Sequence, residues 1–226
     1  YRTFKFTAIA LLAISLSNCT GELTTNSSTD VDESTILSST TGLNMSLTGT
    51  YKYLLLGESG ASSQNDACYA GVTGLCMGYD LLGADILSTK NYGGSVEDHY
   101  RFSEGRTQSA GDYAKRIWTN MYKIINQVNV IIDALPEATG SEAEKAELKG
   151  QCLAMRGIAY FNLLLNYQQT YAIAKDKRGV ILRLSSDDPD SMPFSTVEQG
   201  YQQVIKDLKD AESLLASFER IEEWRV

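Results

Sequence analysis

The sequence has 226 residues, 43% of them hydrophobic, and a formal net charge of −8. After removal of an N-terminal signal and tether, this length suits one domain with a sizeable core. The acidic balance, with no basic cluster, argues against a surface that neutralises phosphates and therefore against nucleic acid as a partner.

The N-terminal residues predict an export signal over residues 1–18. Arg2 and Lys5 supply positive charge, and a short apolar run follows. The run is shorter than the roughly 20 apolar residues that span a bilayer. Cys19, directly after it, predicts a bacterial lipoprotein that is cleaved before this residue and acylated on its thiol. An ordinary secretory signal with an incidental cysteine is the alternative.

The polar stretch after the signal predicts a flexible tether. We assign residues 19–40 to the lipidated cysteine and this tether, and residues 41–226 to an incomplete helical domain. Leu43, Leu47 and Tyr51 open the domain at helical spacing, which predicts a helix that ends at Gly57.

Residues 59–111 are rich in glycine and predict a long loop, with one short helix near residues 79–87. Long ordered loops in compact domains usually serve a function. A strongly helical pattern then runs from residue 117 to Leu135, and Pro136 ends it.

A capping box of Ser141 and Glu144 predicts the start of the next helix, which extends to about Tyr167. Its second half is apolar on nearly every side, so we expect neighbours to bury it from several directions. Residues 171–193 are expected to be irregular, and 180–182 to be extended.

A last long helix is capped by Ser195 or Thr196, with Glu198 or Gln199 three residues further on. Two long helices joined by about five residues and followed by a third predict an all-α helix-hairpin fold.

One helix carries a strip of polar and aromatic residues, Trp118, Tyr122, Asn126 and Asn129. Buried aromatics with polar tips, and asparagines that bond backbone, suit a helix that lies beneath irregular chain. Arg156 lies in an apolar helix, where we expect a carboxylate or loop carbonyls to pair with it. We therefore interpret these residues as structural, with ligand contact as the alternative for the strip.

Other reactive residues give no sharp catalytic or metal pattern. His99 is the single histidine and has no recognisable nucleophile beside it. Cys152 is predicted to be a buried thiol, whereas Cys68 and Cys76 could form a disulfide in an exported protein. The aspartates of residues 187–190 are expected to form a turn. We expect no metal, no cofactor and no enzymatic activity.

Three blocks of sequence resemble the SusD-like (RagB/SusD) family of nutrient-binding lipoproteins. Residues 118–136 resemble the family's tryptophan-tyrosine-asparagine helix, and residues 147–163 its "GEA-FLRA-AYF-L" signature. Residues 195–208 are similar to its "STVEEVY-II-DL" helix. The blocks occur in the family's order, and together they span most of the chain.

The resemblance implies a right-handed superhelix of tetratricopeptide-like helix pairs with long irregular loops. It also implies a lipid-anchored protein on the outer face of the outer membrane, which caps a TonB-dependent, SusC-like transporter and hands it a glycan or peptide. Family members are longer than this chain, so we expect a fragment or a short member with an exposed apolar patch on its last helices. The functional alternatives are a helical-repeat adaptor that binds protein and an exported glycoside hydrolase.

Ligand-binding residues are expected in the loop region, as the resemblance implies. Sugar recognition needs aromatic faces together with carboxylates, amides and guanidinium groups. The candidates that supply these groups are Asp80, Asp85, Asn91, Tyr92, His99, Tyr100 and Arg101.

Overall fold

The computed structural model describes residues 33–57, 71–83, 85 and 112–218. By backbone contacts the chain divides into residues 1–35 and residues 36–226, and the second unit contains the long helices. The predicted signal and lipidation site, Cys19, lie outside the described residues. The division into signal, tether and domain therefore stays a prediction.

The described residues form α-helices and two isolated β-bridges, which confirms the all-α prediction. The helices are α2 (Glu33–Leu37), α3 (Thr40–Leu56), α4 (Gly71–Gly83), α7 (Asp112–Ala134), α8 (Glu142–Tyr167), α9 (Tyr171–Ala174) and α10 (Val197–Leu215). No helix in the described ranges is long and apolar enough to cross a membrane.

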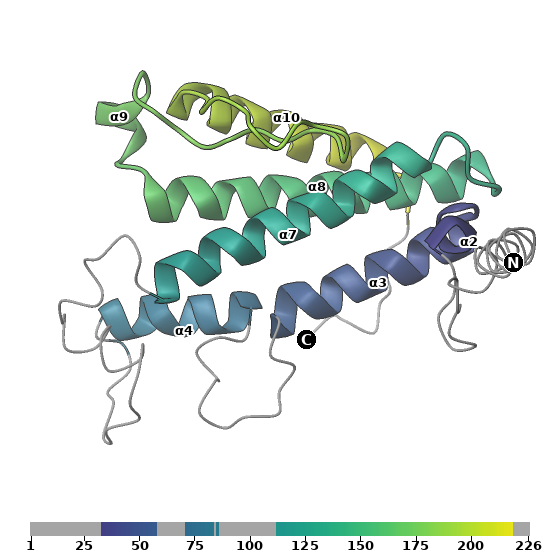
Figure 1. Ribbon diagram of the computed structural model, residues 1–226, viewed down its shortest axis with the longest axis horizontal. Helices are drawn as coiled ribbons and strands as arrows, with labels where there is room; N and C mark the ends of the chain where they lie inside the picture. Colours follow the sequence, from purple (N-terminus) through teal and green to yellow (C-terminus); the bar gives the residue numbers. More distant parts are fainter. Residues whose placement is uncertain (1–32, 58–70, 84, 86–111, 219–226) are drawn as a thin grey trace, which may run out of the picture. The chain divides into compact units, whose positions relative to one another are not determined.

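Helix α8 is the centre of the helical unit. It packs between α7 and α10, while α3 contacts both α7 and α8 (Figure 1). The predicted capping box at Ser141 and Glu144 is present, as is one formed by Thr196 and Gln199 at α10. The core between the helices is mainly aliphatic, and its fully buried members include Leu43, Ile125, Val128, Leu163 and Leu164.

Glycines allow α8 and α10 to approach closely. A Cβ atom at Gly150 would lie 2.7 Å from Cγ of Leu215, and one at Gly200 would lie 2.9 Å from Cδ2 of Leu164. The two helices are antiparallel, so these contacts mark the two ends of their interface (Figure 1). The glycine-containing signature of α8 therefore has a packing role.

The prediction for the glycine-rich region was wrong in one respect. A helix does form there, but α4 spans Gly71–Gly83 rather than residues 79–87. Gly74 and Gly78 of α4 are buried, and α4 packs against both α3 and α7. Glycine lowers helix stability by about 1 kcal/mol per residue, so the sequence alone favoured a loop here. Tertiary packing overrides this preference in the folded chain.

The predicted tether also contains ordered structure. Residues 33–37 form α2, and Ser39 caps α3 by accepting a hydrogen bond from the Gly42 N–H. The Thr40 N–H donates to Thr139 O at 2.9 Å, which ties the start of α3 to the turn between α7 and α8.

An exposed apolar stripe remains on α8 and α10. Ile158, Phe161 and Leu165 are 43–52% exposed on α8, and Ile205 and Leu208 are 44% and 41% exposed on α10. The prediction that neighbours bury the second half of α8 from several directions was therefore wrong for these side chains. The expected exposed apolar patch on the last helices is confirmed.

Two cysteines in the described part of the chain have very different surroundings. Cys76 is exposed with a free thiol, and Cys152 is fully buried, as predicted. Burial raises the pKa of the Cys152 thiol to about 12. Cys68, the possible disulfide partner of Cys76, lies outside the described residues.

This difference predicts selective alkylation of the native protein. Because the thiolate is the reactive form, iodoacetamide near pH 8 should modify Cys152 on the order of a thousandfold more slowly than Cys76. Peptide mapping by mass spectrometry over time measures both rates, and labelling in urea provides the control in which they converge. Equal rates in the native protein would contradict the buried position of Cys152.

Candidate functional site

A buried ion pair joins α8 to α10. The Arg156 guanidinium donates to both carboxylate oxygens of Asp207, each at 2.8 Å. Its third hydrogen-bonding nitrogen donates to Asn129 Oδ1 at 2.8 Å and to Leu184 O at 3.1 Å. Burial alone lowers the pKa of Arg156, but the hydrogen bonds and charge of Asp207 outweigh burial and raise it. The sequence predicted that a carboxylate or loop carbonyls pair with Arg156. The structure confirms this, because Arg156 donates both to the Asp207 carboxylate and to the Leu184 carbonyl.

The same helices hold a stretch of irregular chain, residues 180–186, which we name the braced segment. The Tyr160 hydroxyl accepts from Arg183 N and donates to Arg183 O, both at 2.6 Å. The Tyr122 hydroxyl makes the same pair of bonds with Ile181, both at 2.9 Å. Asn129 Nδ2 donates to Arg183 O at 3.1 Å. Side chains thus replace a neighbouring strand as the partners of this backbone.

The end of the braced segment is a turn fixed by two aspartates. Asp133 of α7 accepts hydrogen bonds from Ser186 N at 2.7 Å and from the hydroxyls of Ser185 and Ser186. Asp188 accepts from Leu184 N at 2.6 Å. The turn therefore spans residues 185–188, two residues before the predicted 187–190.

Burial of the tyrosine hydroxyls predicts a loss of stability at high pH. Burial raises the pKa of Tyr122 to about 12 and also raises that of Tyr160, compared with about 10 in an unfolded chain. Both groups therefore stabilise the fold fully below pH 10, and this contribution is lost as the pH rises through the folded-state values. Urea unfolding between pH 9 and pH 11.5 should show the decline.

Tyr122→Phe is the variant that isolates this effect. It should flatten the decline, because its side chain has no proton to lose, even though its stability at pH 9 is lower. A slope identical to that of the parent chain would contradict the assignment.

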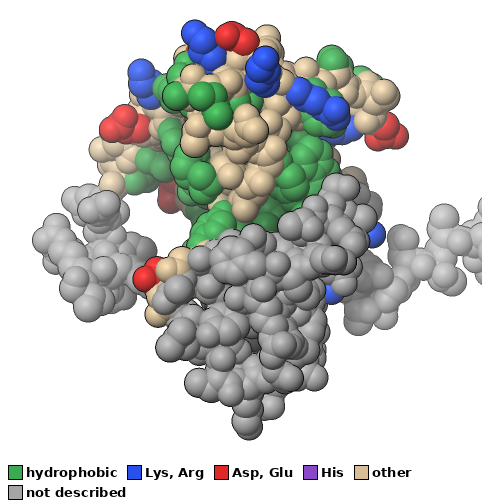
Figure 2. Space-filling model, turned by 90° about the vertical axis from the view of Figure 1, so that its left-hand side faces the viewer, with side chains coloured by type: hydrophobic (Ala, Val, Ile, Leu, Met, Phe, Trp, Pro, Cys, Tyr) green, Lys and Arg blue, Asp and Glu red, His purple; other side chains and the backbone are tan. Residues whose placement is uncertain are grey.

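Aromatic side chains gather where the first half of α7 meets the end of α8 and the chain before α10. The Trp118 ring lies 4.8 Å from Tyr122, 5.1 Å from Tyr167 and 6.5 Å from Phe194, between centroids. The Arg178 guanidinium lies 3.5 Å from the Phe194 centroid. Figure 2 views this end of the molecule and shows Lys and Arg side chains above hydrophobic ones. The structural interpretation of the strip is confirmed for Trp118, Tyr122 and Asn129.

A groove of about 510 Å³ lies beside α10. The chain between α9 and α10 runs alongside α10 and returns to it (Figure 1). One wall of the groove comes from this chain and the other from the first three turns of α10. Its principal lining residues are Leu182, Met192, Phe194, Glu198, Gln199, Gln202, Gln203 and Lys206.

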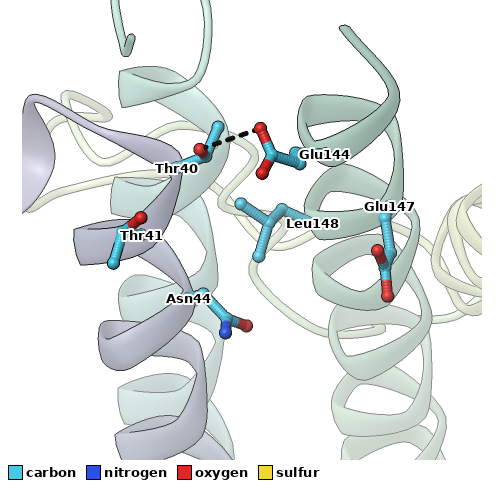
Figure 3. A pocket seen from close by; sticks show the side chains of 6 residues that line it. All are labelled: Thr40, Thr41, Asn44, Glu144, Glu147 and Leu148. Atoms are coloured by element: carbon cyan, nitrogen blue, oxygen red, sulfur yellow. Dashed lines mark hydrogen bonds between the residues drawn. The ribbon is translucent and has the colours of Figure 1, made fainter. Parts of the chain in front are cut away.

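A second, smaller pocket of about 250 Å³ lies between the N-terminal turns of α3 and α8. Figure 3 shows Thr40 facing Glu144, with the Thr40 hydroxyl donating to the carboxylate at 3.3 Å. Glu144 also accepts from Ser141 N at 2.8 Å, and this bond is the main cause of its lowered pKa. Glu147 points away from Thr40 (Figure 3). The Glu144 carboxylate is thus committed to the helix cap, which favours a structural role.

The predicted ligand residues are only partly described. Asp80 lies on α4 and is exposed, and its carbonyl accepts a hydrogen bond from Asp85 N at 2.9 Å. The structure therefore brings these two residues together. The remaining candidates, Asn91, Tyr92, His99, Tyr100 and Arg101, lie outside the described residues.

Sequence reasoning missed the α10 groove. Gln199, Gln202 and Gln203 are spaced so that they share one helical face, and this spacing was the available signal. The spacing alone does not indicate a groove, because the sequence does not show which segment forms the other wall.

Comparison with known proteins places these features in context. A family described as SusD-like, "Starch-binding associating with outer membrane", matches residues 83–222. No curated protein sequence matches this chain significantly.

Solved structures show the same fold. A SusD-like carbohydrate binding protein from Bacteroides vulgatus is 25% identical, with a TM-score of 0.69 over 80% of this chain. A SusD superfamily protein from Bacteroides thetaiotaomicron is also 25% identical, with a TM-score of 0.59 over 78% of this chain. The matches cover 37% of each of those two chains, so this chain spans well under half of their length.

Proposed function

Because the chain belongs to the SusD-like family, we propose that it is a surface-exposed outer-membrane lipoprotein that binds a nutrient glycan. It delivers this glycan to a TonB-dependent, SusC-like transporter. The observation that carries the proposal is the match over residues 83–222 to a family described as starch-binding and associated with the outer membrane.

The braced segment supports a binding role on a rigid scaffold. Side chains from α7 and α8 fix its backbone through short hydrogen bonds. A surface that is ordered before ligand arrives loses less conformational entropy on binding. Capture and transfer of a glycan require no bond to be broken, so the proposal includes no enzymatic activity.

Two further parts of the proposal concern anchoring and recognition. Cys19 carries the lipid that holds the protein at the membrane. Ligand recognition involves the loop candidates Asp80, Asp85, Asn91, Tyr92, His99, Tyr100 and Arg101. Both parts follow from the sequence and from the family.

The test uses the natural gene product in its native membranes. Metabolic labelling with a fatty acid should mark the protein, and Cys19→Ala should abolish the label. Affinity purification should recover a TonB-dependent barrel, and calorimetric titration with maltohexaose, xylohexaose and mannohexaose should detect binding of at least one. Failure of all three sugars to bind, together with no barrel, would reject the proposal.

A protein-binding adaptor is the second candidate, and the exposed apolar stripe on α8 and α10 favours it. Large exposed apolar patches commonly mark interaction sites. The adaptor predicts a stable protein partner and no saccharide binding, so the same titrations separate the two functions.

A further inference from the structure

The wall of the groove that α10 forms includes three glutamine amides, each oriented by a hydrogen bond. The Gln199 Oε1 accepts from Thr196 N at 2.8 Å. Gln202 Nε2 donates to Glu198 Oε1 at 2.7 Å, and Gln203 Nε2 donates to Asp207 Oδ1 at 2.9 Å. Each amide is therefore oriented by a hydrogen bond at one of its two polar atoms, Oε1 in Gln199 and Nε2 in Gln202 and Gln203.

The other half of each amide remains for a ligand. An amide has two donor hydrogens and a carbonyl acceptor. Gln199 retains its Nε2 donors, while Gln202 and Gln203 retain their Oε1 acceptors within the described part of the chain. A hydroxyl group both donates and accepts hydrogen bonds, so a pair of neighbouring hydroxyls matches this mixed surface.

The opposite wall is apolar. Met192 and Phe194 line it, and Phe194 keeps 38% of its surface exposed. The Arg178 guanidinium stacks on the ring and holds it in place. An aromatic wall facing a few placed polar groups, in a volume of about 510 Å³, has the composition of a small-molecule site. The C–H groups of a pyranose are suited to such a wall.

The two charged side chains that line the groove, Glu198 and Lys206, already have hydrogen-bonding partners. Glu198 accepts hydrogen bonds from the Tyr171 hydroxyl and from Gln202, and the Tyr171 bond is the main cause of its lowered pKa. Lys206 pairs with Asp210 at 2.5 Å. A charged ligand would have to compete with these pairs, so the groove favours an uncharged one.

We propose that the groove between residues 192–195 and α10 binds a neutral saccharide. Phe194 contacts its C–H face, and Gln199, Gln202 and Gln203 bond its hydroxyls. The inference rests on the proposed glycan-binding function and adds to it a site outside the loop candidates together with a ligand class.

The test uses Trp118 as the reporter, because its ring lies 6.5 Å from Phe194. The full chain carries Trp224→Phe so that Trp118 is the remaining tryptophan. Maltohexaose, xylohexaose and mannohexaose are titrated by fluorescence and by calorimetry, with hexagalacturonate as the anionic comparison. We expect at least one neutral hexasaccharide to bind more tightly than hexagalacturonate and to change the Trp118 emission.

Two variants remove ligand bonds while keeping the internal ones. Gln199→Glu keeps the acceptor of the capping box but loses the Nε2 donors, and Gln202→Lys keeps a donor to Glu198 but loses the acceptor. Each should weaken binding about threefold to tenfold. Ser213→Glu adds a charge to α10 away from the groove and should leave the affinity unchanged.

The outcomes distinguish this inference from the proposed function. Calorimetric binding that neither variant weakens, with no change in Trp118 emission, rejects the groove and leaves glycan binding intact. Preferential binding of hexagalacturonate rejects the neutral ligand class. No binding of any probe rejects both proposals.

Discussion

Replacing Arg156 by methionine is expected to lower the free energy of unfolding by about 3 to 5 kcal/mol. The change leaves the Asp207 carboxylate fully buried without its cation, and it removes the hydrogen bonds to Asn129 and Leu184. Urea unfolding followed by far-UV circular dichroism measures the loss.

Two comparisons make this test specific. Lys206→Met breaks a neighbouring but exposed ion pair on α10 and should cost less than about 1 kcal/mol. Arg156→Met combined with Asp207→Leu removes both buried charges and should recover much of the lost stability. A loss for Arg156→Met no larger than that for Lys206→Met would show that the buried pair is unimportant.

Replacing Gly179 by alanine is expected to cost about 1 to 3 kcal/mol, as overpacking in a buried position does. A Cβ atom there would lie 2.5 Å from Thr196 O and 2.8 Å from Val197 N. Both are backbone atoms, so no side-chain rotation can relieve the clash. The Gly179 N–H also donates to Ser195 O at 2.7 Å, next to the wall of the α10 groove. The substitution should therefore weaken saccharide binding in the groove as well.

Gly49 provides the matched control on α3. A Cβ atom at Gly49 meets no atom within 4 Å, so Gly49→Ala should stabilise the chain by roughly 0.5–1 kcal/mol through helix propensity alone. Thermal and urea unfolding of the two variants should thus give changes of opposite sign. Equal effects would contradict the close approach at Gly179.

The long helices could be predicted from sequence because local signals agree with the fold. Ser141 and Glu144 mark the start of α8, and Pro136 marks the break before it. The α4 helix could not be placed correctly, because its glycines lower the helix propensity and its packing against α3 offsets this only in the folded chain. Helix propensity depends on the residues of α4 alone, whereas the packing depends on another helix of the fold.

The candidate site was less predictable than the fold. Arg156 clearly needed a partner, but Asp207 lies 51 residues away and only the antiparallel approach of α8 and α10 brings them together. The groove glutamines are ordinary exposed residues until Phe194 and its neighbours form the opposite wall. The two walls of the groove adjoin in the chain, at residues 192–195 and along α10, but neither contains a motif that indicates a groove.

The way in which the braced segment is held leaves its side chains free to change during evolution. Its main chain is hydrogen-bonded by the side chains of Tyr160, Tyr122 and Asn129. The backbone amides and carbonyls are the same whatever side chains the segment carries. Mutations in the segment's outward-facing side chains can therefore accumulate without altering its path. One helical framework can in this way carry different side chains along the same backbone path.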